Sequence, residues 1–147
     1  MNEPMDFTLN GIMNAERQAI RPMSFTEPFW EATKEKKLVL QYCPETDQYQ
    51  FFPRPMSLYT GKRNVEWREV SGEGELYSYT IARRSRPPYQ GHEPFAVGLV
   101  TLDAGVNVIG NLINLEEEDI KVGMRLKPYW YPLPEGHHLL MFEPNGS

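Results

Sequence analysis

The chain has 147 residues, 40% of them hydrophobic and 24% charged, which is ordinary for one folded domain with at most a small appendage. Its formal net charge of -5 disfavours general binding to nucleic acid, because such binding depends on neutralising phosphates with Lys and Arg. The one cysteine, Cys43, excludes an internal disulfide. The N-terminal residues lack the apolar core of a secretory leader, and no apolar run is long enough to span a bilayer, so we expect a cytoplasmic protein.

The first part of the chain is expected to contain an arm and then a helix. Residues 1–23 show no sustained periodicity and contain Arg21-Pro22, which predicts a mobile or partner-dependent arm. Residues 24–37 are the clearest helical segment, because Ser24 and Glu27 have the spacing of a capping box and lysines crowd the end.

Three large aromatic side chains lie on one side of this predicted helix: Phe25, Phe29 and Trp30. They form a heavy apolar face for so short a segment. Two interpretations remain open from the residues alone. The three rings either cap the adjacent domain or dock on another chain.

The rest of the chain predicts a mainly β fold. Short strands at 38–42 and 49–53, each followed by a turn, indicate a pair of small hairpins, and residues 65–70 lead from them into the main body. From residue 73 onward, strands recur at regular spacing, with a hairpin turn at Asp103-Ala104-Gly105 and a helical turn between the third and fourth strands. This pattern predicts a five-stranded OB-fold barrel, and an SH3-like barrel is the competing structure. The five strands are expected at 75–84, 95–103, 106–113, 125–133 and 137–144.

Two of the predicted turns, CPET and SLYT, each hold two positions three residues apart. A zinc ribbon has this spacing, since each of its two turns supplies two thiolates to a tetrahedral zinc ion. In this chain the four positions are Cys43, Thr46, Ser57 and Thr60. Only Cys43 can become a thiolate, and structural zinc sites do not rely on hydroxyl groups. Taken alone, this spacing would therefore carry no meaning.

The surrounding sequence gives the spacing its meaning. The segments FWEATKEKKLVLQYC, FFPRP, WREVSGEGELYSYTI, PFAVGLVTLDAGVNVIGNL and IKVGMRLKPYW occur in the order typical of one family. Together they cover roughly residues 24 to 143 and resemble the acyl-CoA-associated family of a rubredoxin-like zinc ribbon fused to an OB-fold, called domain of unknown function 35. The resemblance implies a helix plus degenerate zinc ribbon at 24–70 and an OB-fold barrel at 71–147.

The chain departs from the family at three of the four ligand positions, so the resemblance implies the shape of the ribbon but not the metal. We therefore expect no bound zinc and no tightly bound cofactor. The small hairpins would then depend on packing between aromatic side chains. Those available are Tyr42, Tyr49, Phe51, Phe52 and Tyr59.

No residue pattern predicts catalysis by this chain alone. The histidines are His92, His137 and His138, and none lies in a recognisable nucleophile, metal or phosphate-binding motif. The adjacent His137 and His138 would point to opposite faces of a strand, which disfavours joint binding of one metal. We expect no catalytic residues.

A basic cluster lies where the first barrel strand runs into a loop: Arg83, Arg84 and Arg86, with Tyr89 close behind. Loops of OB-folds commonly bind ligands, and guanidinium groups grip phosphates, so the phosphates of coenzyme A are a candidate ligand. The alternatives are a solvated loop and an ion-paired contact with a partner chain.

The resemblance implies a function as a non-catalytic accessory subunit of a thiolase, aldolase or C-acyltransferase. In that picture the partner is a thiolase-like or hydratase-like large subunit in a hetero-oligomer, contacted through Phe25, Phe29 and Trp30, and coenzyme A is shared with it. The small chain stabilises the large subunit and helps to form the acyl-CoA channel. The alternative function is an OB module that binds single-stranded nucleic acid, which the acidic net charge disfavours.

Overall fold

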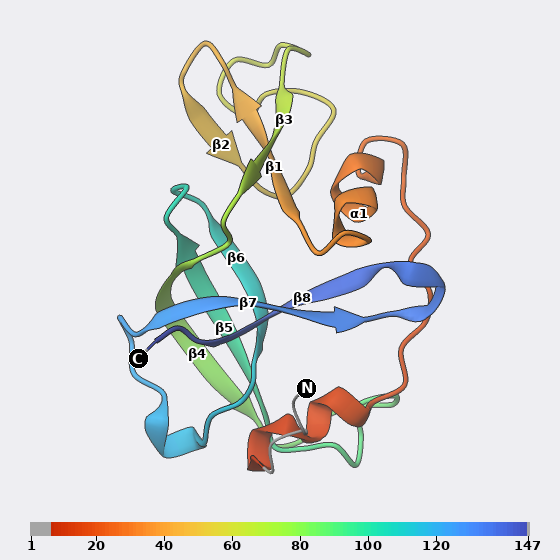
Figure 1. Ribbon diagram of the computed structural model, residues 1–147, viewed down its shortest axis with the longest axis vertical. Coiled ribbons are helices and arrows are strands. Elements are labelled where there is room, and N and C mark those ends of the chain that lie inside the picture. Colours follow the sequence, from red (N-terminus) through yellow and green to blue (C-terminus); the bar gives the residue numbers. More distant parts are fainter. Residues whose placement is uncertain (1–6, 147) are drawn as a thin grey trace.

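The computed structural model describes residues 7–146, in which a small three-stranded sheet sits above a closed five-stranded barrel (Figure 1). The chain is mainly β, as predicted. Its elements in order are η1 (Thr8–Asn14), α1 (Glu27–Thr33), β1 (Leu38–Cys43), β2 (Gln48–Gln50), β3 (Glu66–Val70), β4 (Gly74–Ala82), β5 (Phe95–Leu102), β6 (Asn107–Leu112), η2 (Glu117–Asp119), β7 (Arg125–Pro132), η3 (Pro134–Gly136) and β8 (His138–Pro144), where η marks a short 3-10 helix.

The barrel has the strand order β4-β5-β6-β8-β7 and closes where β4 meets β7. Antiparallel pairs form every junction except that of β6 and β8, which run parallel and meet at Leu112 and Phe142. The short helix η2 lies between the third and fourth strands of the barrel. This is the predicted five-stranded OB arrangement, and the competing SH3-like barrel is not formed.

Two glycines allow the barrel strands to approach closely. A Cβ atom on Gly74 would lie 2.3 Å from the carbonyl oxygen of Thr101 on β5. A Cβ atom on Gly110 would lie 3.0 Å from Cδ2 of Phe142, which is fully buried. Any other residue at Gly74 would therefore push β4 away from β5.

The small sheet has the order β2-β1-β3, with both neighbours antiparallel to the central strand. The structure thus adds residues 66–70 as a third strand to the hairpin. Strand β1 is buried on both faces. Leu38, Leu40 and Tyr42 lie on one face of β1, and Val39, Gln41 and Cys43 lie on the other.

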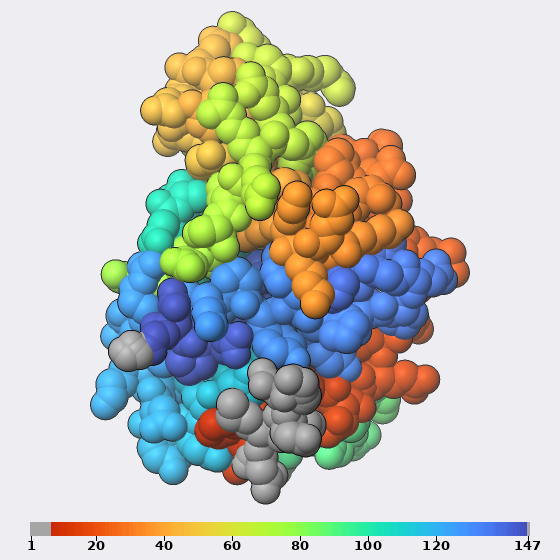
Figure 2. All heavy atoms as spheres, viewed as in Figure 1, coloured from red at the N-terminus to blue at the C-terminus, as the bar shows by residue number. Residues whose placement is uncertain are grey.

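A single apolar core joins the small sheet to the barrel. It contains Phe29 of α1 and Leu40 of β1 together with Leu76, Val100 and Phe142 of the barrel. Figure 2 shows the same relationship on the surface, where α1 fills the space between the small sheet and the β7–β8 hairpin. The sheet is therefore not a separate folding unit beside the barrel.

Helix α1 is shorter than the sequence predicted, and the predicted capping box at Ser24 is wrong. The N-cap residue is Thr26, and its side chain forms no capping bond but instead bonds the backbone of Met23 at 3.0 and 3.1 Å. The helix then ends early because Lys36 adopts a left-handed backbone conformation with φ 59.

The side of α1 that faces the barrel is anchored by a polar contact with β8. The backbone N–H of His138 donates to Oγ1 of Thr33 at 3.1 Å. Nδ1 of the same histidine lies 2.7 Å from the carbonyl oxygen of Thr33. Thr33 itself is 1% exposed, so these bonds form away from water and fix α1 on the barrel.

Residues 7–15 pack on the barrel of this chain, unlike the mobile or partner-dependent arm that the sequence predicted. Leu9 and Ile12 of η1 are each 1% exposed and belong to the two apolar clusters of the barrel. Asn10 and Asn114 bond each other through side-chain and backbone atoms at 2.8 and 2.9 Å. A 3-10 helix of one or two turns has no long periodicity, so the pattern in the sequence was too short to detect. The remaining part of the predicted arm before residue 7 lies outside the described residues.

No helix within residues 7–146 is both long and apolar enough to cross a membrane.

We expect replacement of Leu9 or Ile12 by alanine to lower the free energy of unfolding by about 2–5 kcal/mol, because each change leaves a cavity in the barrel core. Urea denaturation followed by tryptophan fluorescence measures the difference. The exposed Glu16 on the same segment gives the control, since Glu16→Ala should cost less than about 0.5 kcal/mol. If Leu9→Ala were as stable as Glu16→Ala, the segment would not be part of the core.

Candidate functional site

The two turns that carry the zinc-ribbon spacing have the same backbone geometry. In the first, the N–H of Asp47 donates to the carbonyl oxygen of Cys43 at 2.8 Å. In the second, the N–H of Gly61 donates to the carbonyl oxygen of Ser57 at 2.9 Å. Asp47 and Gly61 both have positive φ, 56 and 76 respectively. The ribbon shape that the sequence predicted is therefore present in both turns.

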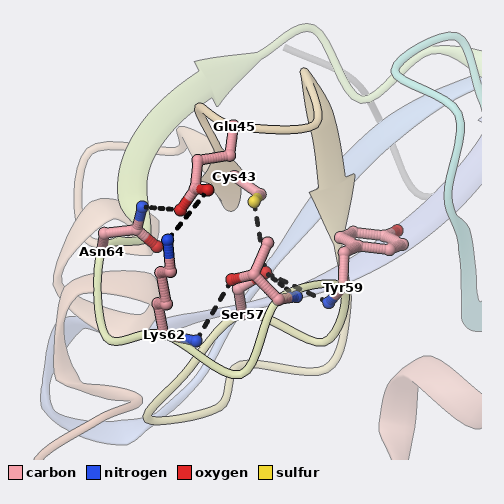
Figure 3. Close-up of polar contacts among 7 residues, drawn as sticks. Cys43, Glu45, Ser57, Tyr59, Lys62 and Asn64 are labelled. Atoms are coloured by element: carbon pink, nitrogen blue, oxygen red, sulfur yellow. Dashed lines mark hydrogen bonds and ion pairs between the residues drawn. The ribbon is translucent and has the colours of Figure 1, made fainter.

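The four predicted ligand positions lie close together, and Figure 3 labels two of them, Cys43 and Ser57. The hydroxyl of Ser57 donates to Sγ of Cys43 at 3.2 Å and accepts the backbone N–H of Tyr59 and Thr60 at 3.1 and 3.2 Å. Hydrogen bonds from the hydroxyls of Ser57 and Thr46 hold the pKa of the Cys43 thiol below its usual value. The thiol is nevertheless 0% exposed, so reagents in solution cannot reach it in the folded chain.

These residues do not fit a structural zinc ion. The set contains one thiol and three hydroxyl groups, whereas structural zinc sites use four sulfur or imidazole ligands. Sulfur and oxygen ligands on one tetrahedral zinc would lie about 3.6 Å apart, and Sγ of Cys43 and Oγ of Ser57 are closer, at a hydrogen-bond distance of 3.2 Å. Within residues 7–146, no group of three His, Cys, Asp or Glu residues is placed to hold a metal.

A polar contact on the surface also connects the two turns (Figure 3). The carboxylate of Glu45, in the first turn, accepts from Nζ of Lys62 at 3.1 Å and from Nδ2 of Asn64 at 3.0 Å. The ion pair is exposed, so it contributes at most about 1 kcal/mol. The hydroxyl of Tyr59 adds a bond to the carbonyl oxygen of Tyr49 at 2.7 Å.

The three aromatic residues that were predicted to contact a partner differ in how deeply the structure buries them. Phe29 is only 8% exposed and packs on Trp30 and Phe51 with ring centroids 5.0 and 5.8 Å away. Phe29 therefore belongs to the core of this chain, whereas the sequence predicted that its ring would face a partner. Trp30 is half-buried and also lies against His137, and Phe25 is half-buried.

An apolar groove of about 320 Å³ opens where α1, the loop after β2 and the barrel meet. Its rim contains two large side chains that remain in water, Phe52 at 60% and Ile109 at 55% exposure. Its lining is almost wholly hydrocarbon, which is uncommon for a surface without a binding role. We define the groove by Phe29, Trp30, Phe52, Val108, Ile109 and Leu140.

Two members of the predicted basic cluster, Arg83 and Tyr89, contact partners within the chain. Arg83 forms an exposed ion pair with Glu117 at 2.6 Å. Tyr89 turns inward and packs on Phe95, with its ring 5.2 Å from the guanidinium of Arg17. Arg84 and Arg86 are exposed and make no ion pair with other residues in the described range.

Sequence reasoning missed two functional features of the small sheet and its surroundings. The groove could not be found, because it combines segments far apart in the chain. The buried side chains of Gln41 and Gln50, each 2% exposed, were also overlooked. A signal for Gln41 existed, since it lies two residues before Cys43 and shares its face of β1.

Comparison with known proteins gives consistent matches along the chain. The family model for the C-terminal OB-fold domain of ChsH2 matches residues 67–131. A probable enoyl-CoA hydratase alpha subunit of Thermomonospora curvata is 30% identical over 132 residues, 86% of this chain and 41% of that protein. A DUF35 domain-containing scaffold protein of Pyrococcus furiosus is 30% identical over 107 residues, 73% of this chain and 78% of that protein.

A solved structure described as the Ltp2-ChsH2(DUF35) aldolase matches with a TM-score of 0.75 and 28% identity, over 87% of this chain and 98% of that chain. The chain thus spans less than half of the hydratase alpha subunit but most of the scaffold protein. The matches extend over both the ribbon and the barrel. The chain therefore belongs to the DUF35 family.

Proposed function

We propose that this chain is a non-catalytic accessory subunit that binds the large subunit of an acyl-CoA enzyme of the hydratase or thiolase type. Three relatives support this function through their descriptions: a hydratase subunit, a scaffold protein and an aldolase that includes a DUF35 chain. The large subunit would supply the catalytic groups. This chain would stabilise it and help to form the channel for the acyl-CoA substrate.

The observation that carries this proposal is the apolar groove. Phe52 and Ile109 are more than half exposed although each could contribute about 1–2 kcal/mol on burial. A partner segment placed there would gain this free energy and also contact Trp30. Exposed aromatic and aliphatic side chains around a concave surface are typical of the central part of a protein interface.

The position of the groove also suits an accessory subunit. Its residues come from α1, from the loop between β2 and β3 and from strands β6 and β8. One partner segment in the groove would therefore contact both the ribbon and the barrel. Binding there would stabilise the arrangement of the two parts as well as the partner.

For coenzyme A, we propose contacts through Arg84 and Arg86 rather than through the whole predicted cluster. Both are exposed and free of ion pairs in the described part of the chain, whereas Arg83 is paired with Glu117. An unpaired guanidinium can bind a phosphate without first giving up another anion.

The first test places a charge on the rim of the groove. We expect Ile109→Lys to weaken binding of the large subunit at least tenfold, or about 1.4 kcal/mol, because the ammonium group would lose water on binding. Val122→Lys is the matched control, since Val122 is 65% exposed and does not line the groove. The tagged chain is purified from its native source, and the partner is identified by mass spectrometry and quantified for each variant.

The expected partner is a hydratase-type, thiolase-type or aldolase-type protein in stoichiometric amount, retained by Val122→Lys and lost with Ile109→Lys. Both variants should melt within a few degrees of the wild-type chain. A partner from an unrelated class of protein would contradict the proposed function. Equal retention of the partner by both variants would contradict the proposed surface.

The second test concerns the acyl-CoA substrate. The isolated chain should not turn over an acyl-CoA, and the complex with the large subunit should. Arg84→Glu with Arg86→Glu should raise the KM of the complex for acyl-CoA several-fold, because two cations near the phosphates are reversed. Arg21→Glu, at another exposed arginine, is the control. An unchanged KM would rule out the phosphate contacts, and turnover by the isolated chain would rule out the accessory role.

A further inference from the structure

Two buried glutamines hold the small sheet and its second turn together. Gln41 on β1 and Gln50 on β2 are directly opposite each other in the strand pair, and each is 2% exposed. We propose that this glutamine pair takes the structural place of the metal ion that the ribbon fold implies. The inference does not depend on the proposed function.

The side-chain amide of Gln41 forms two hydrogen bonds with the backbone of Arg54. Oε1 of Gln41 accepts the N–H of Arg54 at 2.8 Å, and Nε2 donates to the carbonyl oxygen of Arg54 at 2.6 Å. This pairing resembles that between two adjacent strands, with a side-chain amide in place of a peptide group. It fixes the position of Arg54, which precedes the second turn.

The amide of Gln50 binds further along the same loop. Its Nε2 donates to the carbonyl oxygen of Met56 at 3.0 Å, and its Oε1 accepts the N–H of Leu58 at 2.7 Å. Nε2 also donates to Oε1 of Gln41 at 2.8 Å, which joins the two amides. The pair therefore fixes the backbone at Arg54 and Met56, before Ser57, and at Leu58, after it. Ser57 is the first residue of the second turn.

The pair does what a metal ion does in a ribbon: it connects the first hairpin to the second turn. A zinc ion would connect them at Cys43, two residues after Gln41 and on the same face of β1. In this chain the side chain of Cys43 is connected to the second turn by a single hydrogen bond, from the hydroxyl of Ser57 at 3.2 Å. One neutral hydrogen bond contributes far less than a structural zinc ion, so the other bonds must come from elsewhere.

Burial makes the glutamine bonds strong determinants of the loop conformation. Each backbone group bound by the pair would otherwise be partly buried without a partner, which is costly. Phe51 and Phe52 lie between Gln50 and Arg54, so the same bonds set the position of the rim of the groove. The shape of the groove should consequently not depend on a metal.

The first measurement is hydrogen exchange at single amides in the full chain. Gln41→Met should accelerate exchange at Arg54, and Gln50→Met should accelerate exchange at Leu58, each at least tenfold, because each loses its acceptor. Gln48→Met, at an exposed glutamine on the same strand as Gln50, should change neither exchange rate. Unchanged exchange at Arg54 and Leu58 in the two buried variants would overturn the proposal.

The second measurement compares thermal unfolding with and without a chelator. Gln50→Met should lower the melting temperature by about 5 °C or more relative to Gln48→Met, and EDTA should leave the wild-type melting temperature unchanged. Elemental analysis of the dialysed chain should find no stoichiometric zinc. One zinc ion per chain, whose removal lowers the melting temperature as much as Gln50→Met does, would also overturn the proposal.

The third measurement restores the ligands. Because the four positions still converge, Thr46→Cys, Ser57→Cys and Thr60→Cys together should create a site for one zinc ion per chain. Zinc should then recover most of the melting temperature that Gln50→Met loses in this background. If the variant that carries all four changes folds and binds zinc but does not recover this melting temperature, the pair and the metal hold different parts of the ribbon and the proposal is wrong.

Discussion

The structure depends on one apolar core that the ribbon and the barrel share. Phe29 and Leu40 extend from the ribbon side into the same cluster as Leu76 and Phe142 of the barrel. Because the two parts share this core, they cannot tilt freely against each other, and α1 is held between them by Thr33 and His138. The groove exists for the same reason, since its floor is the edge of this core and its rim is formed by Phe52 and Ile109.

The barrel could be predicted from the sequence because its strands are long, regularly spaced and joined by recognisable turns. The hairpin at residues 103–105 is confirmed by the bond from the N–H of Gly105 to the carbonyl oxygen of Leu102 at 2.8 Å. The packing of Leu9 and Ile12 was missed because a short 3-10 helix has too few residues to show a period. The groove was missed because residues 26–30, 51–53, 108–109 and 139–140 meet only in the folded chain.

The aromatic and basic residues singled out in the sequence show a different limit. Phe25, Phe29 and Trp30 are near one another along the chain, but the structure buries Phe29 and leaves Phe25 and Trp30 half-buried. Arg83 and Tyr89 likewise turn to partners within the chain, which leaves Arg84 and Arg86 in solvent. Residue type indicates what a side chain can bind, whereas tertiary contacts decide which side chains remain free to bind it.

Under the proposed function, the groove is the surface on which a large acyl-CoA enzyme subunit docks. The most direct measurement is a structure of the complex purified with that subunit, determined by cryo-electron microscopy. We expect a segment of the large subunit in contact with Trp30, Phe52 and Ile109, with these side chains removed from water. A well-resolved complex in which the groove remains open to solvent, and the large subunit contacts another face of the chain, would contradict it.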